Sequence, residues 1–436
     1  MLLRGRITVA ILAALVIAGT YGISRSFGGD EGDAVTVASA LPPVDAPPVD
    51  VPPPTAPLRL PLDPPVSEGS LEQAASVPVP LDRGDLSGPL RVEYTLNQDL
   101  TRSIWEILKR GRVGLGHVIV MDPESGALLA YASTDVERFP PTRPYPAASL
   151  VKVITMAAAI DRAPETAARP CRYAGNQYRL SPSRIDPPRS GPSVSMSRAL
   201  ATSNNQCFAQ LAVHVVGAPS LLAAIDRFGW LDVPGPGHAE GVAADPGEDR
   251  YALGRLGCGL DGARITPLHA AILAATLADG WRIEPYWVRR ILDSGGRELP
   301  LSPPQPRQRI LTSELASELR EILAETTVRG TARRAFRDRR GHPLLQQVKV
   351  AGKTGSLSGK DPDGRYEWFI GVAPADRPKI AIAAVTVQAP VYWVRASQIA
   401  AEVLKVIFCP GGACSPAAAD RWREPPRGGE LARSEG

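Results

Sequence analysis

Residues 148–160 read Ala-Ser-Leu-Val-Lys-Val-Ile-Thr-Met-Ala-Ala-Ala-Ile and contain neither Gly nor Pro, while Asp161-Arg162-Ala163-Pro164 follows directly. This pattern predicts a helix that ends before the proline. Residues three apart on a helix share one face, with Cβ atoms about 5–6 Å apart, so Lys152 can aim its amine at the Ser149 hydroxyl. Ser149 would then lie in the first turn, where free N–H groups and the helix dipole favour negative charge.

A serine next to a lysine suggests nucleophilic chemistry. A serine hydroxyl is a poor nucleophile at neutral pH unless a neighbouring base takes its proton. Lys152 can act as that base only when it is unprotonated, which requires burial or a nearby positive charge to lower its pKa. Lys353 is the candidate for this second cation. Taken alone, the pair is more simply explained as an N-cap serine followed by a solvated lysine.

Two further strings follow in the chain, Ser203-Asn204-Asn205 and then Lys353-Thr354-Gly355. Ser203 could pass a proton between Lys152 and a leaving group, and Asn205 could bind a substrate amide through its oxygen and NH₂. Singly, helix capping explains the second string and a Gly-rich turn explains the third. All three in this order form the S-x-x-K, S-x-N and K-T-G set of enzymes that attack an acyl donor with a serine.

The third string has the character of a strand edge. A β-rich lead-in at 348–350 precedes it, and its glycines allow a substrate backbone to approach closely. Lys353 and Thr354 could hold a substrate carboxylate by charge-assisted hydrogen bonds. The backbone N–H groups of Ser149 and Ser356 could form an oxyanion hole.

With these strings the chain resembles the transpeptidase domain of penicillin-binding proteins, the serine acyltransferases that crosslink bacterial peptidoglycan. The resemblance extends to a hairpin at 118–130, a Thr-Pro-Leu segment at 266–268 with an Ala-rich helix stopped by Gly280, a Gly-Thr-Ala helix start at 330–332, and strands at 368–374 and 380–387. It implies an α+β fold, in which a central antiparallel sheet has helices on both faces and an all-helical subdomain is attached.

The resemblance also implies roles for individual residues. Ser149 would be the acylated nucleophile, Lys152 its general base and Ser203 a proton relay. The implied substrate-binding residues are Asn205, Lys353, Thr354, Gly355 and Ser356. The implied reaction attacks the D-Ala-D-Ala amide of a stem peptide, expels D-Ala and passes the acyl group to an amine acceptor, and β-lactams would inhibit by mimicking the donor. No cofactor is expected, and the 5 His residues lack metal-ligand spacing.

The departures from the family pattern are small. Ala147-Ala148 stands where larger relatives usually have Pro-Gly, and Ser356 stands where Thr is more frequent. A Glu-x-x-Leu-Asn segment like that of class A β-lactamases is missing from the sequence. Three interpretations stay open: a DD-transpeptidase, a DD-carboxypeptidase, endopeptidase or β-lactamase-like hydrolase that uses water, and a non-catalytic β-lactam sensor or scaffold.

The N-terminal 33 residues predict a membrane anchor. Residues 7–23 are uncharged and apolar, at the short end for a transmembrane helix. Arg4 and Arg6 precede this run and acidic residues follow it, which predicts a single-pass plasma-membrane (inner-membrane) protein with its catalytic domain on the extracytoplasmic, periplasmic side. A cleaved signal peptide is the alternative.

The rest of the chain divides by composition. Residues 34–90 are rich in Pro and predict a disordered linker, 91–408 form the expected transpeptidase domain, and 409–436 predict a disordered tail. A helix over 94–110 is expected as the first element of the domain.

Charge and cysteine content add weaker constraints. A net charge of +4 is too mild to indicate nucleic-acid binding. Of the 5 Cys, Cys409 and Cys414 could close a small loop, and one more disulfide could form among Cys171, Cys207 and Cys258. A cell-wall synthesis complex is a conceivable partner that the sequence does not identify.

Overall fold

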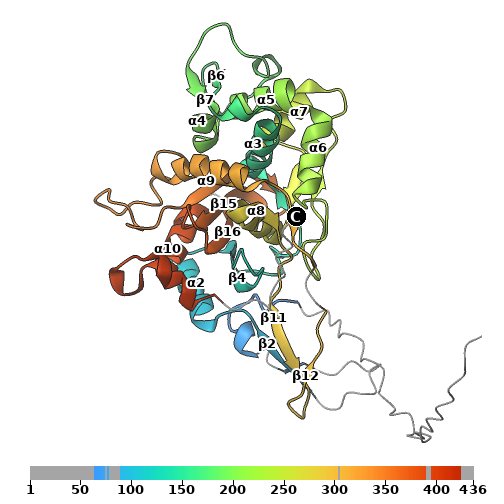
Figure 1. The fold of residues 1–436 in the computed structure, drawn as a ribbon, viewed down its shortest axis with the longest axis vertical. Helices are drawn as coiled ribbons and strands as arrows, with labels where there is room; N and C mark the ends of the chain where they lie inside the picture. The colour runs from blue at the N-terminus through green and yellow to red at the C-terminus, as the bar shows by residue number, and fades with distance from the viewer. Residues whose placement is uncertain (1–62, 74–75, 78–88, 303–304, 389–393, 424–436) are drawn as a thin grey trace, which may run out of the picture. The chain divides into compact units, whose positions relative to one another are not determined.

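The computed structural model describes residues 63–73, 76–77, 89–302, 305–388 and 394–423 (Figure 1). The predicted anchor at 7–23 and most of the predicted linker lie outside the described residues. Within the described part of the chain, no single helix has the length and apolarity to cross a membrane, while one bent pair of helices, Asn205–Val216 with Ala218–Arg227, meets the length and composition test.

A five-stranded antiparallel sheet with the order β14-β15-β16-β3-β4 forms the centre of the domain. Its strands are β3 (Leu115–Met121), β4 (Leu128–Ser133), β14 (Ala351–Lys360), β15 (Asp363–Ala373) and β16 (Ile380–Gln388). Strands β3 and β4 are buried along their whole length. A strand covered on both faces reads as a continuous apolar run, which is why the sequence indicated these strands. The predicted hairpin and the two later strands are confirmed.

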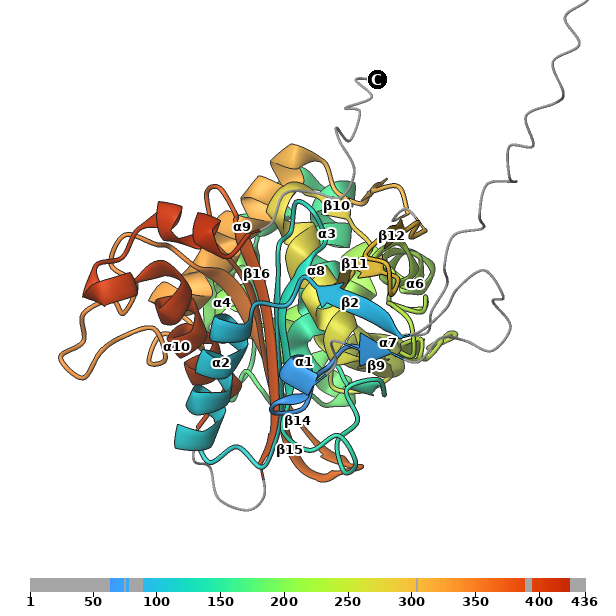
Figure 2. The same cartoon turned by 90° about the horizontal axis from the view of Figure 1, so that it is seen from below.

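Helices cover both faces of this sheet, as Figure 2 shows. On one face α2 (Gln98–Arg110) and α10 (Ala396–Phe408) pack against the sheet in one hydrophobic cluster. The other face packs against α8 (Pro267–Asp279) and α9 (Ser313–Val328) in a larger cluster. Thr266 caps α8 and Gly280 ends it at a φ of 85°, so the predicted helix and its stop are confirmed.

A helical subdomain adjoins the second face. It contains α3 (Val151–Arg162), α4 (Met196–Ala201), α5 (Asn205–Leu211), the π-helical turn Ala212–Val216, α6 (Ala218–Arg227) and α7 (Arg250–Cys258). Helix α5 packs on α7, and α3 contacts α5, α6 and α7. The α+β fold class inferred from the sequence is therefore confirmed for the described residues.

Short elements complete the fold. They are α1 (Ser70–Gln73), β1 (Ser76–Val77), β2 (Leu90–Tyr94), β5 (Tyr145–Pro146), β6 (Pro170–Arg172), β7 (Ser193–Ser195), β8 (Val242–Ala243), β9 (Ala263–Ile265), β10 (Trp281–Arg282), β11 (Val288–Leu292), β12 (Glu298–Leu299), β13 (Gln308–Arg309) and the 3₁₀ turns Ala148–Leu150, Pro164–Ala167, Pro182–Arg184, Pro410–Gly412 and Pro416–Arg421. Strands β1, β2, β11 and β12 form a separate small sheet.

Two sequence-based boundaries differ from the structure. The helix expected over 94–110 begins only at Gln98, because the Asn97 side chain caps it and Tyr94 belongs to β2. The Gly-Thr-Ala segment follows the end of α9 at Val328 and starts no helix. The first difference arises because the N-cap Asn97 sets where the helical backbone begins, and the second expectation rested on the family resemblance.

The predicted linker and tail are also shorter than expected. Leu71 is buried in the core, and the Ser133 N–H donates to the Val66 carbonyl at 2.9 Å, so part of 34–90 is packed against the domain. Residues 409–423 are likewise ordered, since Arg423 forms ion pairs with Asp122 at 3.0 Å and Glu124 at 2.6 Å. Pairing with distant residues stabilises segments whose local composition resembles disorder.

Two disulfides join Cys171 to Cys207 and Cys409 to Cys414, while Cys258 is a buried free thiol. Both pairings are among the alternatives that the sequence left open. The first bond ties the start of a long loop to α5, which carries Asn205.

We expect the first disulfide to stabilise the fold more than the second, because it closes 36 residues of chain and the second closes 5. Loop-closure entropy predicts a loss of about 4 kcal/mol for the Cys171→Ser/Cys207→Ser pair and about 2 kcal/mol for Cys409→Ser/Cys414→Ser. Denaturant unfolding of both double variants measures the difference. An equal or reversed order would contradict this expectation.

Candidate active site

The predicted serine and lysine lie at the start of α3. Ser149 sits in a 3₁₀ turn, Ala148–Leu150, that leads directly into the helix. Lys152 is fully buried, and its Nζ donates to the Ser149 Oγ at 2.8 Å. The expected pairing of the two side chains on one helical face is therefore present.

The backbone before Ser149 turns sharply. Ala148 has a φ of 51°, in the left-handed region that costs a residue with a Cβ about 1–2 kcal/mol. Gly259 comes against this turn with a φ of +69°, and a Cβ there would lie 1.9 Å from the Ala148 carbonyl oxygen. The turn that presents Ser149 thus depends on a glycine from the end of α7.

Three oxygen atoms surround the Lys152 amine. Besides the Ser149 hydroxyl, the Asn205 Oδ1 accepts from Nζ at 2.8 Å and the Cys258 carbonyl accepts at 2.5 Å. Burial lowers the pKa of Lys152 to about 8. The sequence named Lys353 as the cation that would lower this pKa; the structure assigns the shift to burial.

Lys353 is also fully buried, and its Nζ donates to the Ser203 Oγ at 2.9 Å and to the Thr354 carbonyl at 2.6 Å. Burial, with a further contribution from the charge of Lys152, holds the pKa of Lys353 well below its usual range. Two neighbouring buried amines cannot both stay protonated at low cost, so the charge of Lys152 favours the neutral form of Lys353.

The loop between α4 and α5 brings the second string to these lysines. Ser203 takes a φ of 58°, and Asn204 caps α5 by accepting from the Cys207 N–H at 3.1 Å. The Asn205 Nδ2 donates to the Tyr178 carbonyl at 2.8 Å. Asn205 therefore holds Lys152 and the loop at 178, while Ser203 contacts Lys353.

The third string lies on β14, the edge strand of the sheet. A Cβ at Gly355 would lie 3.2 Å from the Ala148 Cβ, so this glycine lets the strand pack against the turn that carries Ser149. The Thr354 hydroxyl shares a short hydrogen bond with Thr331, which follows the end of α9. A Cβ at Gly330 would collide with the Ala201 carbonyl at 2.3 Å, so glycine allows this close approach.

These groups open onto a cavity of about 280 Å³. Six of the predicted site residues line it, namely Ser149, Ser203, Asn205, Thr354, Gly355 and Ser356. The two lysines lie behind its wall, fully buried. Sequence reasoning assigned no site role to seven polar or aromatic lining residues, Tyr178, Thr331, Arg365, Glu367, Trp368, Arg395 and Ser397. The position of Glu367 on β15, opposite Ser356 in the sheet register, could have indicated one of them.

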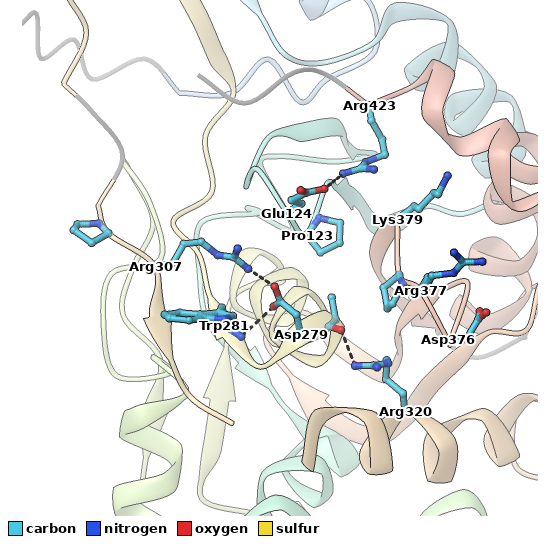
Figure 3. A pocket seen from close by; sticks show the side chains of 13 residues that line it. Pro123, Glu124, Asp279, Trp281, Arg307, Arg320, Asp376, Arg377, Lys379 and Arg423 are labelled. Atoms are coloured by element: carbon cyan, nitrogen blue, oxygen red, sulfur yellow. Dashed lines mark hydrogen bonds and ion pairs between the residues drawn. The ribbon is translucent and has the colours of Figure 1, made fainter. Parts of the chain in front are cut away.

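A second hollow of about 810 Å³ lies at the end of α8 and contains none of the predicted site residues (Figure 3). Two pairs of its charged groups bind each other: Arg307 donates to Asp279, and Arg423 donates to Glu124. Arg320 donates to the Leu277, Ala278 and Ala375 carbonyls, which holds the end of α8. Within the described residues, no group of three or more His, Cys, Asp or Glu could hold a metal ion.

The site combines a buried lysine against a serine hydroxyl with the Ser-x-Asn and Lys-Thr-Gly groups around the same pocket. This combination is typical of the serine acyltransferases that the sequence indicated. The chain belongs to the penicillin-binding protein family, since the family model described as "Penicillin binding protein transpeptidase domain" matches residues 116–408. The family resemblance inferred from the sequence is therefore confirmed.

Individual relatives can now be named. The chain is 28% identical over 339 residues to the peptidoglycan D,D-transpeptidase PbpA of Mycolicibacterium smegmatis, a match that covers 67% of this chain and 66% of PbpA. The chain thus spans just under two thirds of that relative.

Solved structures share the fold. PBPA from Mycobacterium tuberculosis matches with a TM-score of 0.61 and 24% identity over 73% of this chain and 81% of that one. A penicillin G acyl-enzyme complex of penicillin-binding protein A from the same organism matches with a TM-score of 0.57 and 25% identity, over 72% of this chain and 79% of that one.

The role of Gly259 can be tested by comparison with a second positive-φ glycine. Gly247 has a φ of +53° and no atom within 4 Å of a built Cβ, so Gly247→Ala should cost only about 1–2 kcal/mol of backbone strain. Gly259→Ala adds the clash with Ala148 and should cost more than about 3 kcal/mol, as overpacking typically does in addition to strain. Thermal unfolding of both variants gives the difference, and equal losses would refute the packing argument.

Proposed function

We propose that this protein is a DD-transpeptidase that crosslinks peptidoglycan stem peptides through an acyl-enzyme on Ser149 and that β-lactams acylate the same serine. The observation that carries the proposal is the fully buried Lys152 amine, 2.8 Å from the Ser149 Oγ, with its pKa lowered to about 8 by burial. A nucleophile with an adjacent base of suitable pKa is the arrangement that acyl transfer by serine requires.

In the first half-reaction the neutral Lys152 amine takes the hydroxyl proton as the Ser149 Oγ attacks the carbonyl carbon of the penultimate D-Ala. The N–H groups of Ser149 and Ser356 hold the oxyanion. The C–N bond then breaks, and the nitrogen of the departing D-Ala receives a proton through Ser203, whose hydroxyl Lys353 holds at 2.9 Å. An amine acceptor reverses these steps and leaves as the crosslinked amide.

The environment of Lys152 suits both protonation states. At pH 7 a group with a pKa of about 8 is neutral in roughly a tenth of the molecules, which leaves a base available. After proton transfer, the Asn205 Oδ1 and the Cys258 carbonyl accept from the ammonium and stabilise its charge.

Either acceptor, an amine or water, needs a base beside the acyl-serine. Among the described lining residues of the cavity the only carboxylate is Glu367, which pairs with Arg365 at 3.4 Å and Arg395 at 4.0 Å. Lys152, 2.8 Å from the Ser149 Oγ, is therefore the base that would serve both acceptors, and the amine-exchange experiment below decides between them.

We also propose that residues 7–23 anchor the protein in the plasma membrane and that the Pro-rich segment up to 62 carries the domain on the extracytoplasmic side. The support is the apolar run, the arginines before it and the proline content.

The nucleophile can be tested with a fluorescent penicillin. We expect the wild-type protein to be labelled covalently and Ser149→Ala to remain unlabelled, with an unfolding temperature close to that of the wild type because only one hydroxyl is lost. Gel fluorescence after denaturation measures the label. If the wild type stays unlabelled at high probe concentration, the serine-acylation mechanism is wrong.

The general base predicts a pH profile. Because neutral Lys152 is the active form, the second-order rate constant of acylation should rise about tenfold per pH unit below the pKa and level off above about pH 8. The rate can be followed by stopped flow, from the quenching of intrinsic protein fluorescence on acylation, over a range of about three pH units around neutrality. A rate that falls as the pH rises would require a protonated lysine and contradict the assignment.

The acceptor can be tested with a D-Ala-D-Ala pentapeptide and an added D-amino acid or stem-peptide amine. A transpeptidase should release D-Ala and form the exchanged or crosslinked peptide, which mass spectrometry detects. Release of D-Ala with tetrapeptide as the sole product, at every amine concentration, would favour the carboxypeptidase alternative.

A further inference from the structure

The proposed reaction leaves open which group supplies positive charge to the donor's terminal carboxylate. Lys353 was the sequence-based candidate, but it is 0% exposed and does not line the cavity. Its recorded hydrogen bonds run to the Ser203 hydroxyl and the Thr354 carbonyl, which are protein groups. A buried amine already bound to two oxygens is poorly placed to hold a third, charged partner.

The side of the cavity next to Ser356, here called the cationic wall, carries two exposed guanidinium groups, those of Arg365 and Arg395. Arg365 on β15 is 51% exposed, lines the cavity, and its Nε donates to the Ser356 Oγ at 2.7 Å. Arg395 immediately precedes α10, is 63% exposed, and lines the same cavity. Both groups thus lie at the surface that a ligand over Ser356 would contact.

Glu367 pairs with both guanidinium groups of the cationic wall. Its side chain is 9% exposed, it faces Ser356 across the β14–β15 pair, and it lies 3.4 Å from Arg365 and 4.0 Å from Arg395. Among the groups that line the described cavity, two guanidinium groups accompany one carboxylate, so this lining has a net positive charge.

The donor's terminal carboxylate is expected to lie next to the cationic wall. In a D-Ala-D-Ala donor the terminal carboxylate is one Cα away from the leaving nitrogen, so it lies within about 5 Å of the carbonyl carbon attacked by Ser149. When that carbonyl oxygen lies between the N–H groups of Ser149 and Ser356, the carboxylate comes close to the Ser356 side chain. The Arg365 guanidinium is already bound there.

We propose that Arg365, positioned by Ser356 and Glu367, binds the donor's terminal carboxylate together with Thr354, and that Arg395 completes the cationic wall. Lys353 instead holds the Ser203 hydroxyl in place for proton transfer. A planar guanidinium binds a carboxylate in two parallel hydrogen bonds and stays charged at all working pH values, which suits it to this task. This inference rests on the proposed acyl-transfer function and assigns a substrate contact within it.

The test compares two acylating probes, a penicillin with its free ring carboxylate and its methyl ester, on the full-length protein. The measured quantity is the ratio of the two acylation rate constants. In Arg365→Gln this ratio should fall by about 10- to 100-fold, the range expected for a charge-assisted hydrogen bond. Arg365→Lys should restore part of the ratio, because it returns the charge without the planar fork.

Two further variants separate the alternatives. Arg377→Gln is the matched control, since Arg377 lines the separate hollow of Figure 3 and should leave the ratio at its wild-type value. Lys353→Met should lower both rate constants and preserve their ratio, because Lys353 acts through Ser203.

Failure of the Arg365 assignment and failure of the proposed acyl-transfer function give different results. If neither probe acylates the wild type, the proposed function itself fails. If the wild type is acylated but Arg365→Gln keeps the wild-type ratio, or if Lys353→Met abolishes the preference for the carboxylate, Arg365 does not bind that carboxylate and the inference is overturned.

Discussion

The burial of the Lys152 amine against the Ser149 hydroxyl is the constraint on which the rest of this site depends. An ammonium group removed from water is costly unless oxygen atoms surround it, and here the Asn205 side chain and the Cys258 carbonyl supply them. These two acceptors come from α5 and from the end of α7, so the buried lysine depends on the assembled helical subdomain. The same burial lowers the pKa of Lys152 to about 8 and makes it usable as a base.

A second buried amine adds a further requirement. Lys353 approaches from the edge strand β14 and binds the Ser203 hydroxyl. Because two neighbouring buried cations repel, burial and the charge of Lys152 together hold the pKa of Lys353 well below its usual range. The sheet and the helical subdomain thus meet at two buried lysines and the Ser203 hydroxyl, which the proposed mechanism uses for proton transfer. In the proposed binding mode, positive charge for a substrate carboxylate comes from Arg365 and Arg395 at the surface of the cavity.

Much of this arrangement could be predicted from the sequence because it is local. The Ser149–Lys152 spacing, the hairpin around 118–130, the Thr266 cap with its Gly280 stop and the two strands after the Lys-Thr-Gly string each follow from short-range patterns that the structure reproduces. Long-range features could not be read in this way. Arg365 and Glu367 become part of the cavity only through the register of β15 on β14, and the ordered residues near Leu71 and Arg423 depend on partners far along the chain.

The central claim is that Lys152 is a buried base of lowered pKa, and its titration tests this most directly. Nuclear magnetic resonance of protein labelled at the lysine Cε and Nζ atoms, with Lys152→Met used to assign the signal, would follow the protonation of this amine. The account predicts a midpoint near pH 8, against the usual 10.5. A midpoint at or above 10.5 would show that the amine stays charged at physiological pH, and Lys152 could not then serve as the base for Ser149.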